Sequence, residues 1–268
     1  MDVLNNISRL KQKIQFDPFS ILESIPKFSK KEISDIFIFR FDGFDTEFIA
    51  ENSLALLTGS KILCDHLLLF FDEQGHFLKS ERLPTDLYHK KISIKTLLDI
   101  EKVKLGSFVH FVRYSDEILK EYSSILKETT FQHRGYTGFK LNDSLAYSYV
   151  HGNYGGIYKK HQNNIFSVSR IRQKFVYTPQ VKLKPGFKYE FFFVSPNKKN
   201  IILDFYKVKN NKKDHIKTFK LKFLEICSLV LSFDDNSEVY NVSWESHLPV
   251  GRCIIFENNM HTNNVFHS

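Results

Sequence analysis

The sequence contains few cysteines, methionines and tryptophans. Only 3 Cys, 2 Met and 1 Trp occur among its 268 residues. The Cys residues are odd in number, lie in or beside apolar runs and show no CxxC spacing, namely Cys64, Cys227 and Cys253. This pattern argues against a disulfide framework and a structural zinc site. It is typical of buried free thiols in a reducing compartment.

Long apolar segments are missing as well. The longest apolar run, HLLLFF at 66–71, has the length of a strand, whereas a membrane-spanning helix needs about 20 apolar residues. Residues 1–16 lack the basic start and apolar stretch of a secretory signal peptide. We therefore expect no membrane span and a cytoplasmic location.

Sequence patterns of several enzyme classes are also absent. There is no G-x-S-x-G motif, and HGNYGG at 151–156 lacks the Lys and Ser/Thr of a phosphate-binding P-loop. No histidine pair has the spacing of a zinc-protease helix, and no pair of catalytic carboxylates stands out. These absences favour a protein that is not an enzyme and predict no cofactor and no bound metal.

The charge of the chain is basic, at +8 with a pI near 9.2. Lysine pairs stand where turns are expected, at 30–31, 90–91, 198–199 and 212–213. Because lysines in turns and on strand edges commonly protect sheets from aggregation, we do not expect nucleic acid as a partner.

Phenylalanine and tyrosine are abundant, with 27 Phe and 12 Tyr, and both favour the half-buried surface of a sheet. Short apolar or alternating segments recur between turn signals such as DEQG at 72–75. This spacing predicts a mainly β fold: an antiparallel β-sandwich of the jelly-roll or immunoglobulin-like type. The predicted strands are 33–41, 53–57, 66–71, 90–98, 106–114, 174–183, 188–194, 200–208, 215–223, 227–233, 238–244 and 252–257.

Two segments have helical spacing instead. Apolar residues in 2–15 recur on one side of a helix and predict a short N-terminal helix. Residues 115–129 begin with Ser115, a suitable N-cap, followed by Asp116 and Glu117 in the first turn, where the helix dipole favours acids. We expect one helical insertion at 115–129.

The two halves of the chain share an order of segments that favours an internal duplication. GSFVHFVRYS at 106–115 parallels SEVYNVSWES at 237–246, and SLALL with its following apolar strand parallels YEFFFV with NIILDFY. The sequence identity between the paired segments is low, and unrelated strands of similar composition also resemble one another by chance. We predict a helix and linker at 1–30, a first sandwich at 31–158 and a second at 173–268.

The segment 131–158 is rich in residues that recognise ligands, with five Tyr and five Gly. Sugar sites on β-sandwiches combine an aromatic ring with polar groups at loop tips. Tyr147 and Tyr149 share one strand face, and their alternative role is simple packing on the sheet. The candidate ligand-binding residues are His133, Arg134, Tyr136, Tyr149, His151, Asn153 and Tyr154, with a second-half counterpart in His247, Arg252, His261 and His267.

Three functions are compatible with these features. The first is a non-catalytic β-sandwich binding protein whose ligand is a carbohydrate or a surface-glycan precursor. The second is a metal-dependent enzyme in which His133, His151 and either His261 or His267 converge. The third is a structural or assembly protein that forms homo-oligomers through its sheet edges.

Overall fold

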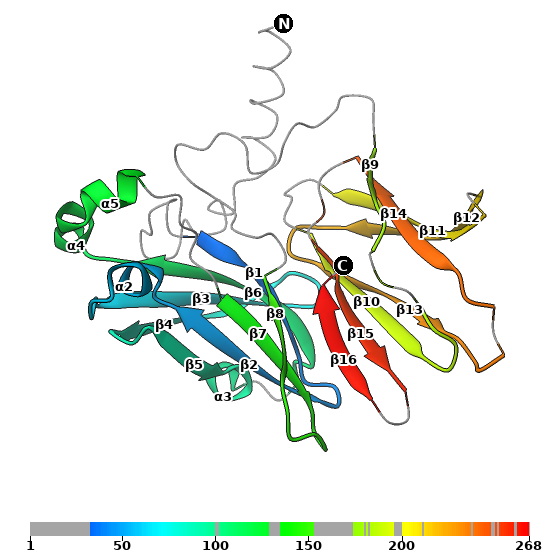
Figure 1. The fold of residues 1–268 in the computed structure, drawn as a ribbon, viewed down its shortest axis with the longest axis horizontal. Helices are drawn as coiled ribbons and strands as arrows, with labels where there is room; N and C mark the ends of the chain where they lie inside the picture. The colour runs from blue at the N-terminus through cyan, green and yellow to red at the C-terminus, as the bar shows by residue number, and fades with distance from the viewer. Residues whose placement is uncertain are drawn as a thin grey trace, which may run out of the picture. The chain divides into compact units, whose positions relative to one another are not determined.

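The structure is a computed structural model that describes residues 33–99, 102–128, 135–152, 174–179, 181, 183–195, 200–210, 212–236, 238–247, 250, 252–259 and 262–267. The fold is mainly β, as predicted, with four antiparallel four-stranded sheets and a few short helices. The described chain forms two compact units, one containing β1 to β8 and the other β9 to β16 (Figure 1). The helix predicted at 2–15 lies outside the described residues.

The first unit contains two sheets, with strand orders β1-β6-β3-β4 and β5-β2-β7-β8. Its described elements are β1 (Ile33–Arg40), β2 (Phe44–Glu51), α2 (Ser53–Thr58), β3 (Cys64–Asp72), β4 (Phe77–Thr85), β5 (His89–Ser93), α3 (Ile94–Leu98), β6 (Leu105–Arg113), α4 (Asp116–Glu121), α5 (Ser123–Glu128), β7 (Gly135–Leu141) and β8 (Ser148–His151).

A layer of phenylalanine side chains fills the space between these two sheets. The ring of Phe37 on β1 stacks on Phe108 of β6, with centroids 5.1 Å apart, and contacts Phe48 of β2 at 4.7 Å. All three rings are buried in one hydrophobic cluster. Since Phe48 belongs to the opposite sheet, this layer is the core of a β-sandwich.

The second unit also contains two sheets, with orders β12-β11-β14-β9 and β13-β10-β15-β16. Trp244 lies at its core, with its ring 5.0 Å from that of Phe193 and 6.1 Å from that of Phe205. Its elements are β9 (Phe175–Tyr177), β10 (Lys188–Val194), β11 (Ile201–Lys209), β12 (Lys212–Leu221), β13 (Ile226–Ser232), β14 (Asn241–Ser246), β15 (Ile254–Asn258) and β16 (Asn263–His267).

The two units have the same strand order when β1 is matched to β9 and each later strand to its successor. The sheet β1-β6-β3-β4 then corresponds to β9-β14-β11-β12, and β5-β2-β7-β8 corresponds to β13-β10-β15-β16. In this scheme the similar segments at 106–115 and 237–246 fall on equivalent strands, β6 and β14.

The prediction of a strand at 53–57 is wrong, because these residues belong to helix α2. The side chain of Asn52 accepts a hydrogen bond from the Ala55 N–H and caps the helix, and Gly59 ends it with a φ of 68°. The strand that matches β10 is therefore β2 and not the SLALL segment.

Several further predictions differ from the structure at their ends, and the strand expected at 174–183 is observed only at Phe175–Tyr177. The strand expected at 90–98 ends at Ser93, whose side chain accepts from the Thr96 N–H and caps the short helix α3. The insertion at 115–129 is helical and begins after the Ser115 cap, as expected, but it consists of two helices that meet at Tyr122.

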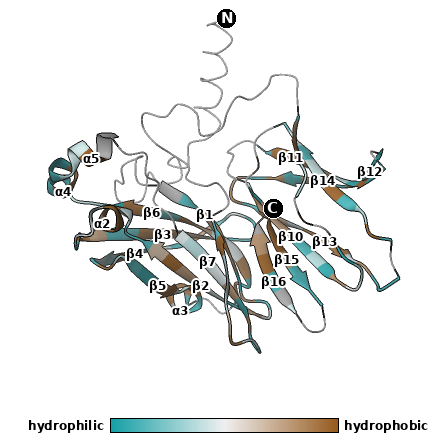
Figure 2. Ribbon diagram, in the orientation of Figure 1, coloured by the Kyte–Doolittle hydropathy of each residue, from teal (hydrophilic) through white to brown (hydrophobic). Residues whose placement is uncertain are grey.

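In each unit, one sheet has mainly buried, apolar side chains on the side that faces away from the core, and the other sheet has polar side chains there. On the inner strands of β1-β6-β3-β4, several side chains that point away from the phenylalanine layer are apolar and buried, including Ile38, Leu69 and Phe111; β3 and β6 are coloured largely as hydrophobic in Figure 2. On β13-β10-β15-β16, Phe192 and Phe256 are likewise buried. The remaining sheets, β5-β2-β7-β8 and β12-β11-β14-β9, carry the polar side chains that a ligand could meet.

Candidate functional site

The outer face of β5-β2-β7-β8 gathers tyrosines, carboxylates and lysines, and we call it the tyrosine face. It arises from strand alternation: Phe44 and Phe48 of β2 point into the core, so Asp45 and Glu47 point outward. The tyrosine face consists of Asp45, Glu47, Lys91, Tyr136, Gly138, Lys140, Tyr147, Tyr149 and His151.

Gly138 positions the ring of Tyr149. Glu47, Gly138 and Tyr149 are cross-strand neighbours on β2, β7 and β8. A Cβ atom at Gly138 would lie only 2.6 Å from a ring carbon of Tyr149. Since glycine has no Cβ, the ring lies across β7, and its hydroxyl donates a hydrogen bond to Oε1 of Glu47, two strands away.

Tyr147 repeats this arrangement one row along the sheet. Its hydroxyl donates to Oδ2 of Asp45 at 2.6 Å, and its ring lies 6.0 Å from that of Tyr149. The ammonium groups of Lys91 and Lys140 lie 5.5 Å and 5.1 Å from the Tyr147 ring centroid. These distances are within the range of cation–π attraction. The rings of Tyr147 and Tyr149 therefore form an aromatic platform that is held in place by the carboxylates and the lysines.

The protonation states on this face favour hydrogen bonding over nucleophilic chemistry. Burial, with the hydrogen bond to Asp45, raises the pKa of Tyr147, and burial with the bond to Glu47 raises the pKa of Tyr149. The hydrogen bond to Glu47, 2.9 Å long, raises the pKa of Lys91. Both phenols therefore remain neutral donors, and Lys91 remains a cation.

The structure brings three of the predicted site residues onto this face. Tyr136 and His151 are cross-strand partners whose rings lie 4.8 Å apart, and residue Tyr149 is 42% exposed. The other four residues predicted for this site, His133, Arg134, Asn153 and Tyr154, lie outside the described residues.

The predicted second-half residues lie at strand ends. His247 follows β14 and Arg252 precedes β15, and both are exposed. The backbone of His267 pairs with Ile254 at the end of β16, and His261 lies outside the described residues. The sheet that matches the one with the tyrosine face carries Phe192 and apolar neighbours there.

Asp45, Glu47, Lys91 and Lys140 were not predicted from the sequence as site residues, whereas Tyr147 was considered together with Tyr149. Tyr149 and Glu47 are 102 residues apart in sequence, so their contact depends on the register of three strands. One local signal was present: in FDTEF, acids alternate with residues that point into the core. It indicates two carboxylates on one outer face.

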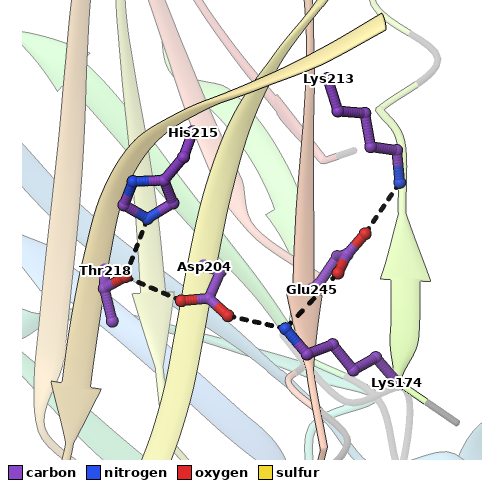
Figure 3. A network of polar contacts seen from close by, with 6 residues as sticks. All are labelled: Lys174, Asp204, Lys213, His215, Thr218 and Glu245. Atoms are coloured by element: carbon purple, nitrogen blue, oxygen red, sulfur yellow. Dashed lines mark hydrogen bonds and ion pairs between the residues drawn. The ribbon is translucent and has the colours of Figure 1, made fainter. Parts of the chain in front are cut away.

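The second unit carries a different polar network, on the outer face of β12-β11-β14-β9 (Figure 3). Lys174 contacts Asp204 at 2.9 Å and Glu245 at 3.6 Å. Thr218 donates to Asp204 at 2.7 Å, and these bonds outweigh burial and lower the pKa of Asp204. Lys213 pairs with Glu245 at 2.8 Å. The groups satisfy one another and tie the strands of this sheet together.

A buried histidine pair lies inside the first unit. Nδ1 of His66 and Nε2 of His110 are 2.9 Å apart, and Sγ of Cys64 lies 3.7 Å from Nε2 of His66. Burial raises the pKa of Cys64 to about 12, and burial with the nearby Lys90 lowers the pKa of His66 to about 4. The prediction of buried free thiols is confirmed for all three Cys.

No group of three or more His, Cys, Asp or Glu among the residues that the structure describes is arranged to hold a metal ion. Nor does this part of the chain include a helix with the length and apolarity needed to cross a membrane. Compared with known proteins, the chain matches no family model and no curated protein sequence.

Proposed function

We propose that the protein is a non-catalytic carbohydrate-binding protein and that the tyrosine face of its first unit is the binding surface. The observation on which this rests is the half-exposed ring of Tyr149, which lies over Gly138 and is held by Glu47. The apolar face of a sugar ring stacks on such a platform. Because the ring is already fixed, little side-chain entropy is lost on binding.

Polar groups beside the rings would bind the hydroxyls of the sugar. A carboxylate has about four acceptor positions, and Tyr149 and Lys91 occupy two of them on Oε1 of Glu47. Asp45 accepts from Tyr147 and retains further positions in the same way. Lys91 and Lys140 supply donors at the edge of the platform.

The electrostatics support binding over catalysis. A phenol that keeps its proton is a weak nucleophile but a good hydrogen-bond donor. Here the pKa values of both phenols are raised. The alternative of a metal-dependent enzyme stays a prediction, since His133 and His261 lie outside the described residues, and so does the assembly role.

A glycan array followed by titration calorimetry on the best binder tests the proposal. Tyr149→Ala removes the platform and should weaken binding about fivefold or more, because stacking contributes roughly 1 kcal/mol beyond area burial. Tyr149→Phe retains the ring and should lose less. Tyr88→Ala is the matched control, because Tyr88 is similarly exposed in the same unit and its hydroxyl donates to Gly59 O.

Two results would contradict the proposal. The first is that the wild-type protein binds no glycan on the array. The second is equal affinity of Tyr149→Ala and the wild type for the bound glycan, with both chains folded.

A further inference from the structure

The positive charge of the chain is concentrated in one hairpin. Residues 207–222 contain seven lysines and one acid, Asp214, which gives a formal charge of +6, against +8 for the whole chain. These residues include the end of β11 and all of β12, and Lys222 follows directly after β12. The hairpin's strongly hydrophilic residues are coloured teal in Figure 2.

The hairpin is a two-stranded ribbon at the edge of its sheet. Lys209 and Lys212 are paired, and Asn210, which follows β11, has a φ of 48°. β12 pairs with β11 and is the first strand in the sheet order, and most of its side chains are exposed. An accessible strand of this kind can follow an extended ligand.

Lysines lie on both sides of the ribbon. Lys207 lies 4.4 Å from the ring centroid of Tyr240, and Lys209 forms an ion pair with Glu238. Lys213 points to the opposite side, where it pairs with Glu245. The charge therefore surrounds the ribbon.

Acidic side chains balance only part of this charge. Lys212, Lys220 and Lys222 form no ion pair within the part of the chain that the structure describes, and all three are exposed. Lysines protect edge strands from pairing with other chains. That role accounts for lysines on β12, but it does not account for Lys207 and Lys209 on the inner strand β11.

We infer that the β11–β12 hairpin binds an anionic polysaccharide, so that the ligand of this protein is an acidic carbohydrate; this inference rests on the proposed function. On the tyrosine face, Lys91 and Lys140 flank the ring of Tyr147 and balance the charges of Asp45 and Glu47. The hairpin contains no arginine. Lysine ammonium groups act as point charges and do not select phosphate over carboxylate or sulfate, so the choice of an acidic glycan over nucleic acid follows from the carbohydrate ligand proposed for the first unit, and duplex DNA is the competing ligand in the test.

Two matched pairs of polymers test the inference: polygalacturonate with its methyl ester, and dextran sulfate with dextran. Each pair keeps the sugar and changes the charge. The wild type should bind an acidic member at least tenfold more tightly than its neutral partner. The affinity should fall as salt is added, because binding displaces counterions from the polyanion.

Variants identify the surface responsible. The triple variant Lys212→Gln, Lys220→Gln and Lys222→Gln should lose most of the preference for the acidic polymer. The control variant Lys61→Gln, Lys102→Gln and Lys104→Gln removes the same charge from exposed positions of the first unit and should retain it. Circular dichroism checks that both remain folded.

Several outcomes would overturn the inference. Equal binding of the acidic and neutral polymers, lost in Tyr149→Ala, overturns it and leaves the proposed function standing. Equal losses in the two triple variants attribute binding to net charge. Tighter binding of duplex DNA than of either acidic polymer favours nucleic acid. Binding of no polymer and of no array glycan overturns both proposals.

Discussion

The buried pair of His66 and His110 should make the first unit sensitive to acid. Both side chains are fully buried, and the pKa of His66 falls from 6.5 to about 4 because burial and Lys90 disfavour its charged form, while Asp65 acts in the opposite direction. The unfolded chain therefore binds a proton at a higher pH than the folded chain does. Stability is retained above pH 6.5 and is lost as the pH falls toward 4.

The size of this effect follows from the two pKa values. Each unit of difference corresponds to about 1.4 kcal/mol of unfolding free energy once the pH lies below both values. With values of 6.5 and about 4, the free energy of unfolding should fall by about 2 kcal/mol between pH 7 and pH 5, and by about 3 kcal/mol at pH 4.

Urea unfolding at pH 7, 6 and 5, followed by circular dichroism, measures the loss. Carboxylates also titrate toward the acid end, so the comparison is with His66→Gln. Glutamine can bond to His110 but does not titrate. The variant should be less stable than the wild type at pH 7, and its stability should depend less on pH, by about 2 kcal/mol at pH 5. The same pH dependence in both proteins would refute the assignment of the effect to His66.

Two further substitutions test other parts of the first unit. Gly138→Val places a side chain where the Tyr149 ring lies; it should displace that ring from Glu47 and reduce glycan binding to the level of Tyr149→Ala, and unchanged affinity in calorimetry would contradict this. Tyr114→Phe removes a hydroxyl that donates to Asn52 Oδ1 at 2.9 Å and accepts from a backbone N–H. It should cost about 1–3 kcal/mol in urea unfolding, whereas Tyr88→Phe, which loses a more exposed bond, should cost less.

The sequence was sufficient to predict the fold class, because sandwich strands carry their own signal. In GSFVHFVRY, Phe108 and Val112 lie on one face of the predicted strand and Val109 and Phe111 on the other, and the segment forms β6. The SLALL segment was misassigned because an apolar run of five residues fits a buried strand as well as a short helix. Its assignment depends on Asn52, whose side chain caps the helix and also donates to Ile62 O.

The candidate site was less accessible from the sequence than the fold. Tyr136, Tyr149 and His151 were found because they are close together in one segment, and β7 and β8 form a hairpin. Glu47 and Asp45 belong to β2, and only the pairing of β2 with β7 places them beside the tyrosines. Register between distant strands is decided by packing of the whole core, and short-range patterns do not contain it.

The shared strand order allows the charge of the β11–β12 hairpin to be compared with its equivalent, the β3–β4 hairpin. Both β4 and β12 are edge strands of equivalent sheets. Residues 64–85, which span β3 and β4, contain four acids and two bases, and Lys79 and Arg82 each pair with an acid, Glu81 and Asp65. An edge hairpin of this topology therefore forms without an excess of lysines, as β3 and β4 show. The two halves also carry their polar outer faces on non-equivalent sheets, so they do not hold two copies of one site. The lysines of the β11–β12 hairpin therefore need an explanation that is specific to the second unit. The proposed anionic ligand provides that explanation.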